Sequence, residues 1–79
     1  MTRKARTAFN QLKKIGVPVK EWHDDSRGHF WIDAEEPDAP LFLDYYDLYW
    51  GSARLNKILE VNDLYFEWHN SAYACVYDA

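Results

Sequence analysis

The stretch LYFEWHNSAYACVYD, residues 64–78, decides the fold of this 79-residue chain. Residues 64–69 alternate strictly, with Leu64, Phe66 and Trp68 on one side and Tyr65, Glu67 and His69 on the other. Successive side chains of a strand point to opposite faces, so this alternation predicts a half-buried β-strand. Asn70 and Ser71 indicate a turn, and residues 72–78 complete another strand.

The same period appears earlier in the chain. Residues 29–34, HFWIDA, alternate, and residues 17–22, VPVKEW, precede them across the turn-rich cluster HDDSRG. These two segments predict a β-hairpin. Pro18 favours an edge position for the first strand, because proline has no N–H to donate to a neighbour.

Two segments have the spacing of amphipathic helices. Residues 2–15 begin at the N-cap candidate Thr2 and stop before Gly16, a favourable residue just beyond a helix end. A second helix over about 53–61 follows Ser52. Residues 35–40 predict a loop. Residues 41–50, LFLDYYDLYW, fit neither period, and we expect a short helix or an irregular segment there.

The predicted order is therefore α-β-β-α-β-β. It indicates one compact α+β domain over residues 1–79, with a small antiparallel sheet of about four strands and two helices on one face. The composition supports a core, since 48% of the residues are hydrophobic and 18% aromatic. The single cysteine, Cys75, is expected to be a buried apolar residue. We expect a cytoplasmic protein, because no signal peptide or membrane-spanning run is recognisable.

The formal net charge of −4 hides a strong asymmetry. The first 20 residues carry six Lys or Arg and no acid, whereas residues 21–79 carry three Lys or Arg and all 13 acids. Such polarisation bears on the choice of partner and on association rates rather than on the fold.

No catalytic or cofactor-binding motif occurs, and we expect neither enzymatic activity nor a cofactor. A small metal site remains an alternative: His23, Asp25 and His29 surround the predicted turn and have suitable ligand chemistry, although their spacing matches no standard motif.

The sequence DAEEPDAPLFLDYYDLYWG, residues 33–51, combines six carboxylates and five aromatic rings with no Lys or Arg. An acidic loop that keeps the protein soluble would explain the acids but not the rings. Exposed Tyr and Trp are typical of interface hot spots, and a rim of carboxylates suits a basic partner. We therefore predict a partner-binding surface with these members: Asp33, Glu35, Glu36, Asp38, Asp44, Tyr45, Tyr46, Asp47, Tyr49 and Trp50.

In these features the chain resembles the small acidic phage-encoded inhibitors of bacterial defence, the anti-CRISPR proteins. The resemblance is one of type: a single small α+β domain with no catalytic motif and with an acidic, aromatic surface. It implies a non-enzymatic inhibitor that binds a CRISPR effector and blocks its access to DNA, in part by imitating the phosphates of a duplex. The predicted binding residues would then occupy a basic channel of that complex. A monomer and a homodimer are both compatible with this reading.

The basic first helix supports an alternative function as a small nucleic-acid-binding accessory protein. Arg3, Arg6, Lys13 and Lys14 would contact phosphates, or else an acidic partner surface or guide RNA. Phe30 and Trp31 could then stack on unpaired bases. The acidic overall charge disfavours this alternative, because nucleic-acid-binding domains are usually basic.

Overall fold

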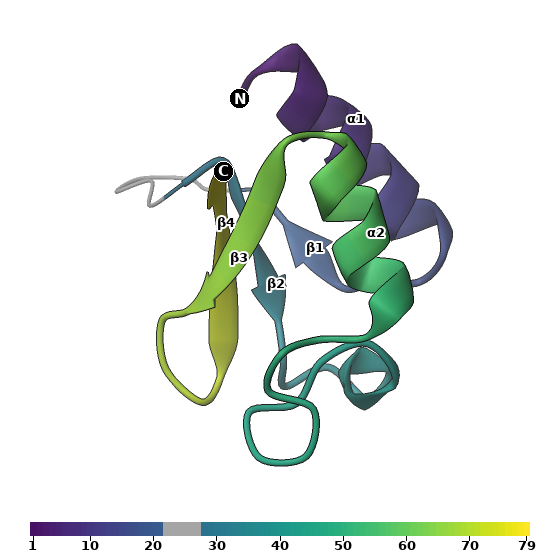
Figure 1. Ribbon diagram of the computed structural model, residues 1–79. Helices are drawn as coiled ribbons and strands as arrows, with labels where there is room; N and C mark the ends of the chain where they lie inside the picture. Colours follow the sequence, from purple (N-terminus) through teal and green to yellow (C-terminus); the bar gives the residue numbers. More distant parts are fainter. Residues whose placement is uncertain (22–27) are drawn as a thin grey trace.

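The computed structural model describes residues 1–21 and 28–79 (Figure 1). Its elements are α1 (Arg3–Lys14), β1 (Val19–Lys20), β2 (Phe30–Asp33), the 3₁₀ turn η1 (Ala39–Leu41), α2 (Ala53–Val61), β3 (Leu64–Trp68) and β4 (Tyr73–Asp78). The α+β class and the order α-β-β-α-β-β are as predicted from the sequence.

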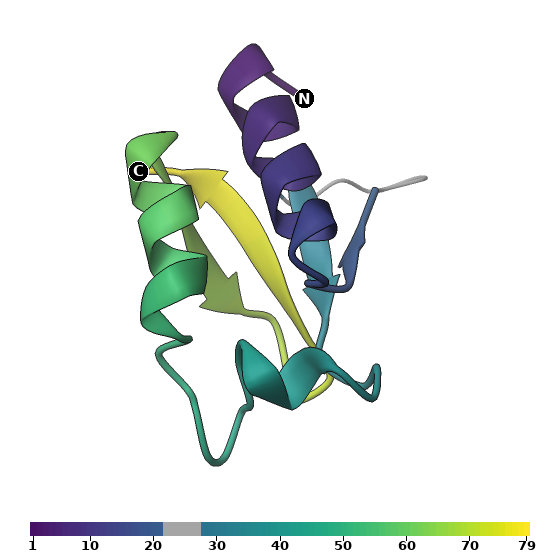
Figure 2. The same ribbon diagram turned by 90° about the vertical axis from the view of Figure 1, so that its right-hand side faces the viewer.

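The four strands form one antiparallel sheet in the order β1-β2-β4-β3, and both helices cover the same face of it (Figure 2). The chain therefore folds as two α-β-β units, one built from α1, β1 and β2 and the other from α2, β3 and β4. The units meet where β2 pairs with β4, although the sequence shows no internal repeat. β1 is an edge strand, as Pro18 predicted.

The core lies between the sheet and the helices. Phe30 and Ile32 of β2 and Val76 of β4 are completely buried, because the alternation of each strand turns these side chains towards the helices. The edge of the Phe9 ring of α1 meets the ring of Phe30, with their centroids 5.3 Å apart. Leu55 of α2 closes the same cluster. Cys75 is also buried, as expected.

The helix ends follow the predicted capping chemistry. Thr2 Oγ1 accepts a hydrogen bond from the Ala5 N–H at 3.2 Å, and Ser52 Oγ accepts one from the Leu55 N–H at 3.1 Å. At the end of α1, Gly16 has a φ of +99°, and the N–H of Val17 reaches back to the Leu12 carbonyl at 3.0 Å. This geometry is a Schellman-type ending, which glycine adopts without strain.

Two segments differ from the prediction. β1 covers only Val19–Lys20 rather than residues 17–22, because Val17 packs into the core directly after the helix turn. Residue 22, the last of the predicted strand, lies outside the described part of the chain. The predicted loop 35–40 runs into η1, a single 3₁₀ turn that starts at Ala39 and has Pro40 as its second residue. Residues 42–50 form no helix and are irregular, one of the two outcomes expected for residues 41–50.

Gly28 offers a test of the contact between the start of β2 and β4. Its φ is +77°, and an added Cβ would lie 2.2 Å from the Val76 carbonyl oxygen, which accepts the His29 N–H at 2.8 Å. We expect Gly28→Ala to lower the free energy of unfolding by about 3 kcal/mol, through strain and loss of that hydrogen bond. Gly16→Ala is the control: it has a positive φ but no heavy atom within 4 Å, and should lose about 1 kcal/mol. Urea unfolding followed by Trp fluorescence measures both, and equal losses would contradict the contact.

Candidate partner-binding surface

Residues 33–51 gather at one end of the molecule, which we call the acidic end. The chain leaves β2 there, passes through η1 and a loop, and returns to α2, while both termini lie at the opposite end (Figures 1 and 2). The structure thus brings all ten predicted partner-binding residues to one end, although they do not have equal roles.

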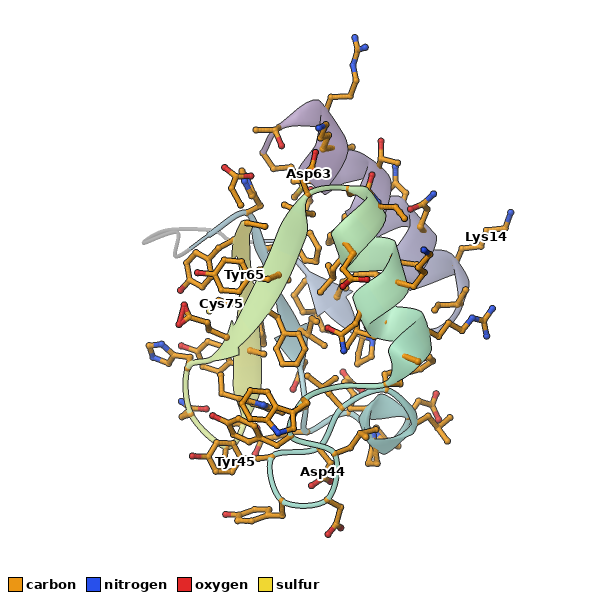
Figure 3. The ribbon with its side chains drawn as sticks, viewed as in Figure 1. Lys14, Asp44, Tyr45, Asp63, Tyr65 and Cys75 are labelled. Carbon is orange, nitrogen blue, oxygen red and sulfur yellow. The ribbon has the colours of Figure 1, made fainter. Side chains whose placement is uncertain are left out.

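Asp44 organises the loop at the tip of the acidic end (Figure 3). Its backbone N–H and C=O exchange hydrogen bonds with Leu48 at 3.0 and 2.9 Å, which closes a five-residue loop. Its carboxylate Oδ1 accepts the N–H groups of Tyr46 at 2.9 Å and Asp47 at 3.0 Å. The Asp47 and Tyr46 hydrogen bonds lower the pKa of Asp44. The Asp44 carboxylate therefore serves mainly to hold the turn, and contact with a partner is at most its second role.

The other five carboxylates of the acidic end differ in whether their side chains have a partner in the described part of the chain. Asp33 Oδ1 accepts the Glu35 N–H at 3.0 Å, and Glu36 forms an ion pair with Lys20 at 3.3 Å. Within residues 1–21 and 28–79, the side chains of Glu35, Asp38 and Asp47 form no ion pair or hydrogen bond, and all three residues are exposed. These three acids are available to a partner, and together with Asp33 and Asp44, whose charge backbone N–H groups do not neutralise, they set up the negative field of the acidic end.

The aromatic residues form a connected group, which we call the ring cluster: Tyr45, Tyr46, Tyr49, Trp50 and Trp68. The half-buried Tyr45 is its centre, with ring centroids 5.4 Å from those of Tyr46 and Tyr49 and 5.3 Å from that of Trp68. Tyr46 and Trp50 protrude, with 81% of each residue exposed. Exposed rings supported by packed rings below them have the make-up of interface anchors.

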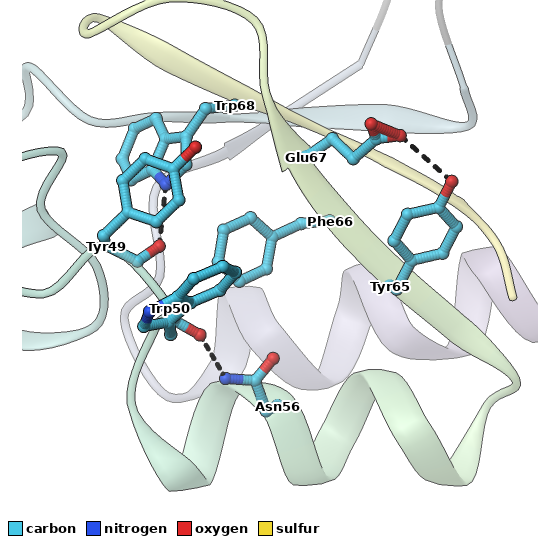
Figure 4. A pocket seen from close by; sticks show the side chains of 7 residues that line it. All are labelled: Tyr49, Trp50, Asn56, Tyr65, Phe66, Glu67 and Trp68. Carbon is cyan, nitrogen blue, oxygen red and sulfur yellow. Dashed lines mark hydrogen bonds between the residues drawn. The ribbon is translucent and has the colours of Figure 1, made fainter.

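Hydrogen bonds fix the loop backbone beneath these rings (Figure 4). Trp68 Nε1 donates to the Tyr49 carbonyl at 2.7 Å, and Asn56 Nδ2 donates to the Trp50 carbonyl at 2.7 Å. The two protruding rings are therefore mounted on a segment that is tied to both β3 and α2. The alternation in the sequence grouped Trp68 with Leu64 and Phe66 but did not reveal its part in the ring cluster. The signal was its indole N–H, which needs an acceptor when it is half buried.

A cavity of about 350 Å³ opens beside the ring cluster, along β3. It is lined by Tyr49, Trp50, Asn56 and the four consecutive residues from Tyr65 to Trp68 (Figure 4). The Tyr65 hydroxyl donates to Glu67 Oε1 at 3.1 Å, and this bond raises the pKa of Tyr65. The shift has a local structural cause and does not indicate a catalytic group.

The basic residues of α1 and α2 lie elsewhere, on the flank formed by the helices. Of the predicted basic face, Arg6 pairs with Glu21 at 2.5 Å, whereas Arg3, Lys13 and Lys14 are exposed. Lys4 is paired with Asp63. Lys14 joins Arg54 and Lys57 of α2 around a shallow groove of about 380 Å³, completed by Gln11, Ile15 and Ile58, which we call the basic groove. Sequence analysis missed Arg54 and Lys57, because only helix packing brings them to Lys14.

The predicted stacking platform of Phe30 and Trp31 is wrong. The two residues are neighbours on β2, so their side chains point to opposite faces of the sheet, and Phe30 is completely buried. Trp31 lies on the face away from the helices, because it alternates with the buried Phe30 and Ile32.

The metal hypothesis concerns residues of which two, His23 and Asp25, lie outside the described part of the chain. His29 is described, and its Nε2 lies 2.8 Å from Asp78 Oδ1. No group of three or more possible metal ligands occurs among the residues that the structure describes.

No protein-family model, curated protein or solved structure was found that matches this chain. In the described part of the chain, no helix combines the length and the apolar character needed to cross a membrane.

The role of Asp44 in the loop can be tested by titration. Because its pKa in the folded protein lies below the ordinary value of 3.8, its contribution to loop order is complete above that value and is lost as the pH falls through the lower folded pKa. We expect the NMR signals of the Tyr46 and Asp47 amides to shift in a transition with a midpoint below 3.8.

Asp44→Asn is the matched control for this titration. It keeps an acceptor oxygen but does not ionise, so the transition assigned to Asp44 should be absent from its spectra. A wild-type midpoint at or above the ordinary value would show that the carboxylate does not hold the turn.

Proposed function

We propose that this protein is a non-enzymatic inhibitor of the anti-CRISPR type, which binds a bacterial nucleic-acid-handling defence complex and blocks its binding of DNA. The acidic end is its contact surface. The protein acts in the cytoplasm of the bacterial host, and its partner is a protein surface built to hold a nucleic-acid backbone.

One observation carries this proposal: two rings that are 81% exposed, Tyr46 and Trp50, lie on the same segment as three uncommitted carboxylates, and that segment contains no Lys or Arg. Exposed aromatic residues lose apolar hydration when a partner covers them, and their few side-chain torsions make them efficient anchors. Isolated exposed rings need no explanation, but a supported pair with a uniform charge around it is a typical binding surface.

The charges act before contact is made. A cluster of carboxylates at one end of a small molecule attracts a basic surface and orients the approach, which raises the association rate at low salt. When the protein has docked, Glu35, Asp38 and Asp47 occupy the positions on the partner that DNA phosphates would take. The exposed rings add an apolar contact that a DNA duplex does not offer. The Asp44 turn keeps both sets of groups in a fixed geometry, which reduces the entropy lost on binding.

The basic groove supports a second candidate function, the binding of a nucleic-acid backbone or an acidic partner surface. Lys14, Arg54 and Lys57 lie around one depression although they come from two helices. Arg54 lies in the first turn of α2, where the helix dipole disfavours a cation, so electrostatics within the fold do not account for its position.

The proposed function is tested by charge reversal at the acidic end. We expect wild-type protein, added as bait to a nuclease-treated lysate with an active CRISPR system, to retain an effector complex. Combined Glu35→Lys, Asp38→Lys and Asp47→Lys should weaken retention at least about tenfold, because like charges across an interface cost several kcal/mol. Asp44 is left unchanged, since its reversal would disrupt the loop.

The control for this experiment is Glu60→Lys, an exposed reversal in the last turn of α2, at the end of the helix away from the acidic end. It should bind like wild type. Circular dichroism confirms that each variant is folded. Unchanged retention of the triple variant would reject the acidic end as the contact surface.

The second candidate function makes a different prediction. If the basic groove binds nucleic acid, affinity for a single-stranded oligonucleotide should fall with salt, with a log–log slope of about −2 for three phosphate contacts. Combined Lys14→Glu, Arg54→Glu and Lys57→Glu should abolish this binding, as measured by fluorescence anisotropy. The acidic-end triple variant is the control, because it leaves the basic groove intact. Binding that survives the groove variant would reject this candidate.

A further inference from the structure

The sheet has two outer strands, and they differ in how their edges are protected. β1 has only two residues and follows Pro18, so it offers little backbone for pairing. β3 has five residues, contains neither Pro nor Lys, and has no other described strand beyond it. An edge strand of this length without Pro, Lys or a covering strand is a template for another strand.

The register of β3 with β4 shows which backbone groups face outward. The His69 N–H donates to the Tyr73 carbonyl at 3.0 Å, and the Ala79 N–H donates to the Asp63 carbonyl at 2.9 Å. Hydrogen-bonded pairs alternate along an antiparallel ladder, so Tyr65 and Glu67 also bond to β4. The N–H and C=O groups of the even-numbered residues, with Phe66 in the centre, therefore point to the open edge.

Space is available along this edge. The cavity of about 350 Å³ runs beside residues 65–68 and is bordered on the helix side by Trp50 and Asn56. A paired strand would lie about 4.8 Å from β3 and would enter this space. It would also cover Trp50 and part of Tyr65, which is 42% exposed.

We propose that the β3 edge is a dimerisation surface, on which a second copy of this chain pairs its own β3 antiparallel, with the two-fold axis at Phe66. This register places Tyr65 opposite Glu67 of the partner subunit, once on each side of the axis. Tyrosine and glutamate are a compatible cross-strand pair, because a phenol can donate to a carboxylate, as it already does within the chain.

Charge selects this register over its neighbours. The outward groups permit only shifts that keep even-numbered residues opposite one another. A shift in one direction places Glu67 opposite Glu67 of the partner subunit, and a shift in the other places Glu67 opposite Asp63 of the partner subunit. Both bring carboxylates together, which destabilises a strand pair. The Phe66-centred register avoids this and also makes the largest number of pairs.

The proposed dimer goes beyond the proposed function and does not depend on it, but the two compete for Trp50, which the paired strand would cover. A two-fold axis at Phe66 reverses the second copy along the strand direction, so the two acidic ends would lie at opposite ends of a continuous sheet. The loop from Asp44 to Leu48 would remain uncovered in both subunits.

Analytical ultracentrifugation over a concentration series tests the dimer. We expect a monomer–dimer equilibrium for wild type and a dissociation constant at least about fivefold higher for Tyr65→Glu, which places Glu opposite Glu67 twice. The double variant Tyr65→Glu with Glu67→Lys should restore dimerisation through Glu–Lys pairs. If the double variant dimerises again, the loss in Tyr65→Glu came from the interface and not from a damaged fold.

Tyr46→Glu is the matched control, because it makes the same change on an exposed tyrosine outside β3. It should dimerise like wild type while losing retention of the effector complex, so failure of the dimer and failure of the proposed function are separable. Amide exchange gives a direct readout: the Phe66 N–H should become protected as the protein concentration rises. Three results would overturn the proposal. The protein could be a monomer at every concentration, or its dimer could be unaffected by Tyr65→Glu. The third is protection of the Phe66 N–H only when a foreign extended peptide is added.

Discussion

The antiparallel pairing of β2 with β4 is the constraint on which the rest of the structure depends. It is the seam between the two α-β-β units, and its register sets Phe30 beside Val76 and Ile32 beside Ala74, all four completely buried. A two-stranded hairpin alone is at best marginally stable in water. The seam converts two such hairpins into one four-stranded sheet with a single apolar face, against which both helices can pack.

The acidic end follows from this arrangement. The connection between the two units must run from the end of β2 to the start of α2, and residues 33–51 make that crossing at one end of the sheet. Phe42 and Leu43 anchor it in the core, and the Asp44 turn closes the part that cannot be buried. Carboxylates and exposed rings are tolerated there because no strand or helix needs to cover this end. A functional surface can therefore be placed on the connection without disturbing the seam.

Much of the fold could be predicted because β2 and β3 each show their buried face as a period of two, and because Thr2, Ser52 and Gly16 mark helix ends by side-chain chemistry that acts locally. The 41–50 segment could not be predicted, since its order comes from one 3₁₀ turn, adjacent buried residues and a carboxylate that caps two N–H groups. None of these produces a period. The false pairing of Phe30 with Trp31 ignored the alternation that had correctly identified their strand.

The candidate site was predicted in composition but not in geometry. The sequence places all ten predicted binding residues in one segment, but it does not show that the Asp44 carboxylate is occupied by the turn or that the Tyr45 ring supports the Tyr46 ring. Long-range contacts supply the remainder: Trp68 enters the ring cluster from β3, and Lys14 meets Arg54 only where α1 packs beside α2. The residue pattern within one segment does not show which residues from other segments will contact it in the fold.

The most direct test of the central claim is a hydrogen–deuterium exchange footprint of this protein, free and bound to the complex that it retains from a lysate. The account predicts that binding slows exchange in residues 33–51, with the strongest effect at the Tyr46 and Trp50 end of that segment, and leaves residues 11–15 and 54–58 unchanged. Protection confined to the basic groove, with the acidic end exchanging as in the free protein, would contradict it.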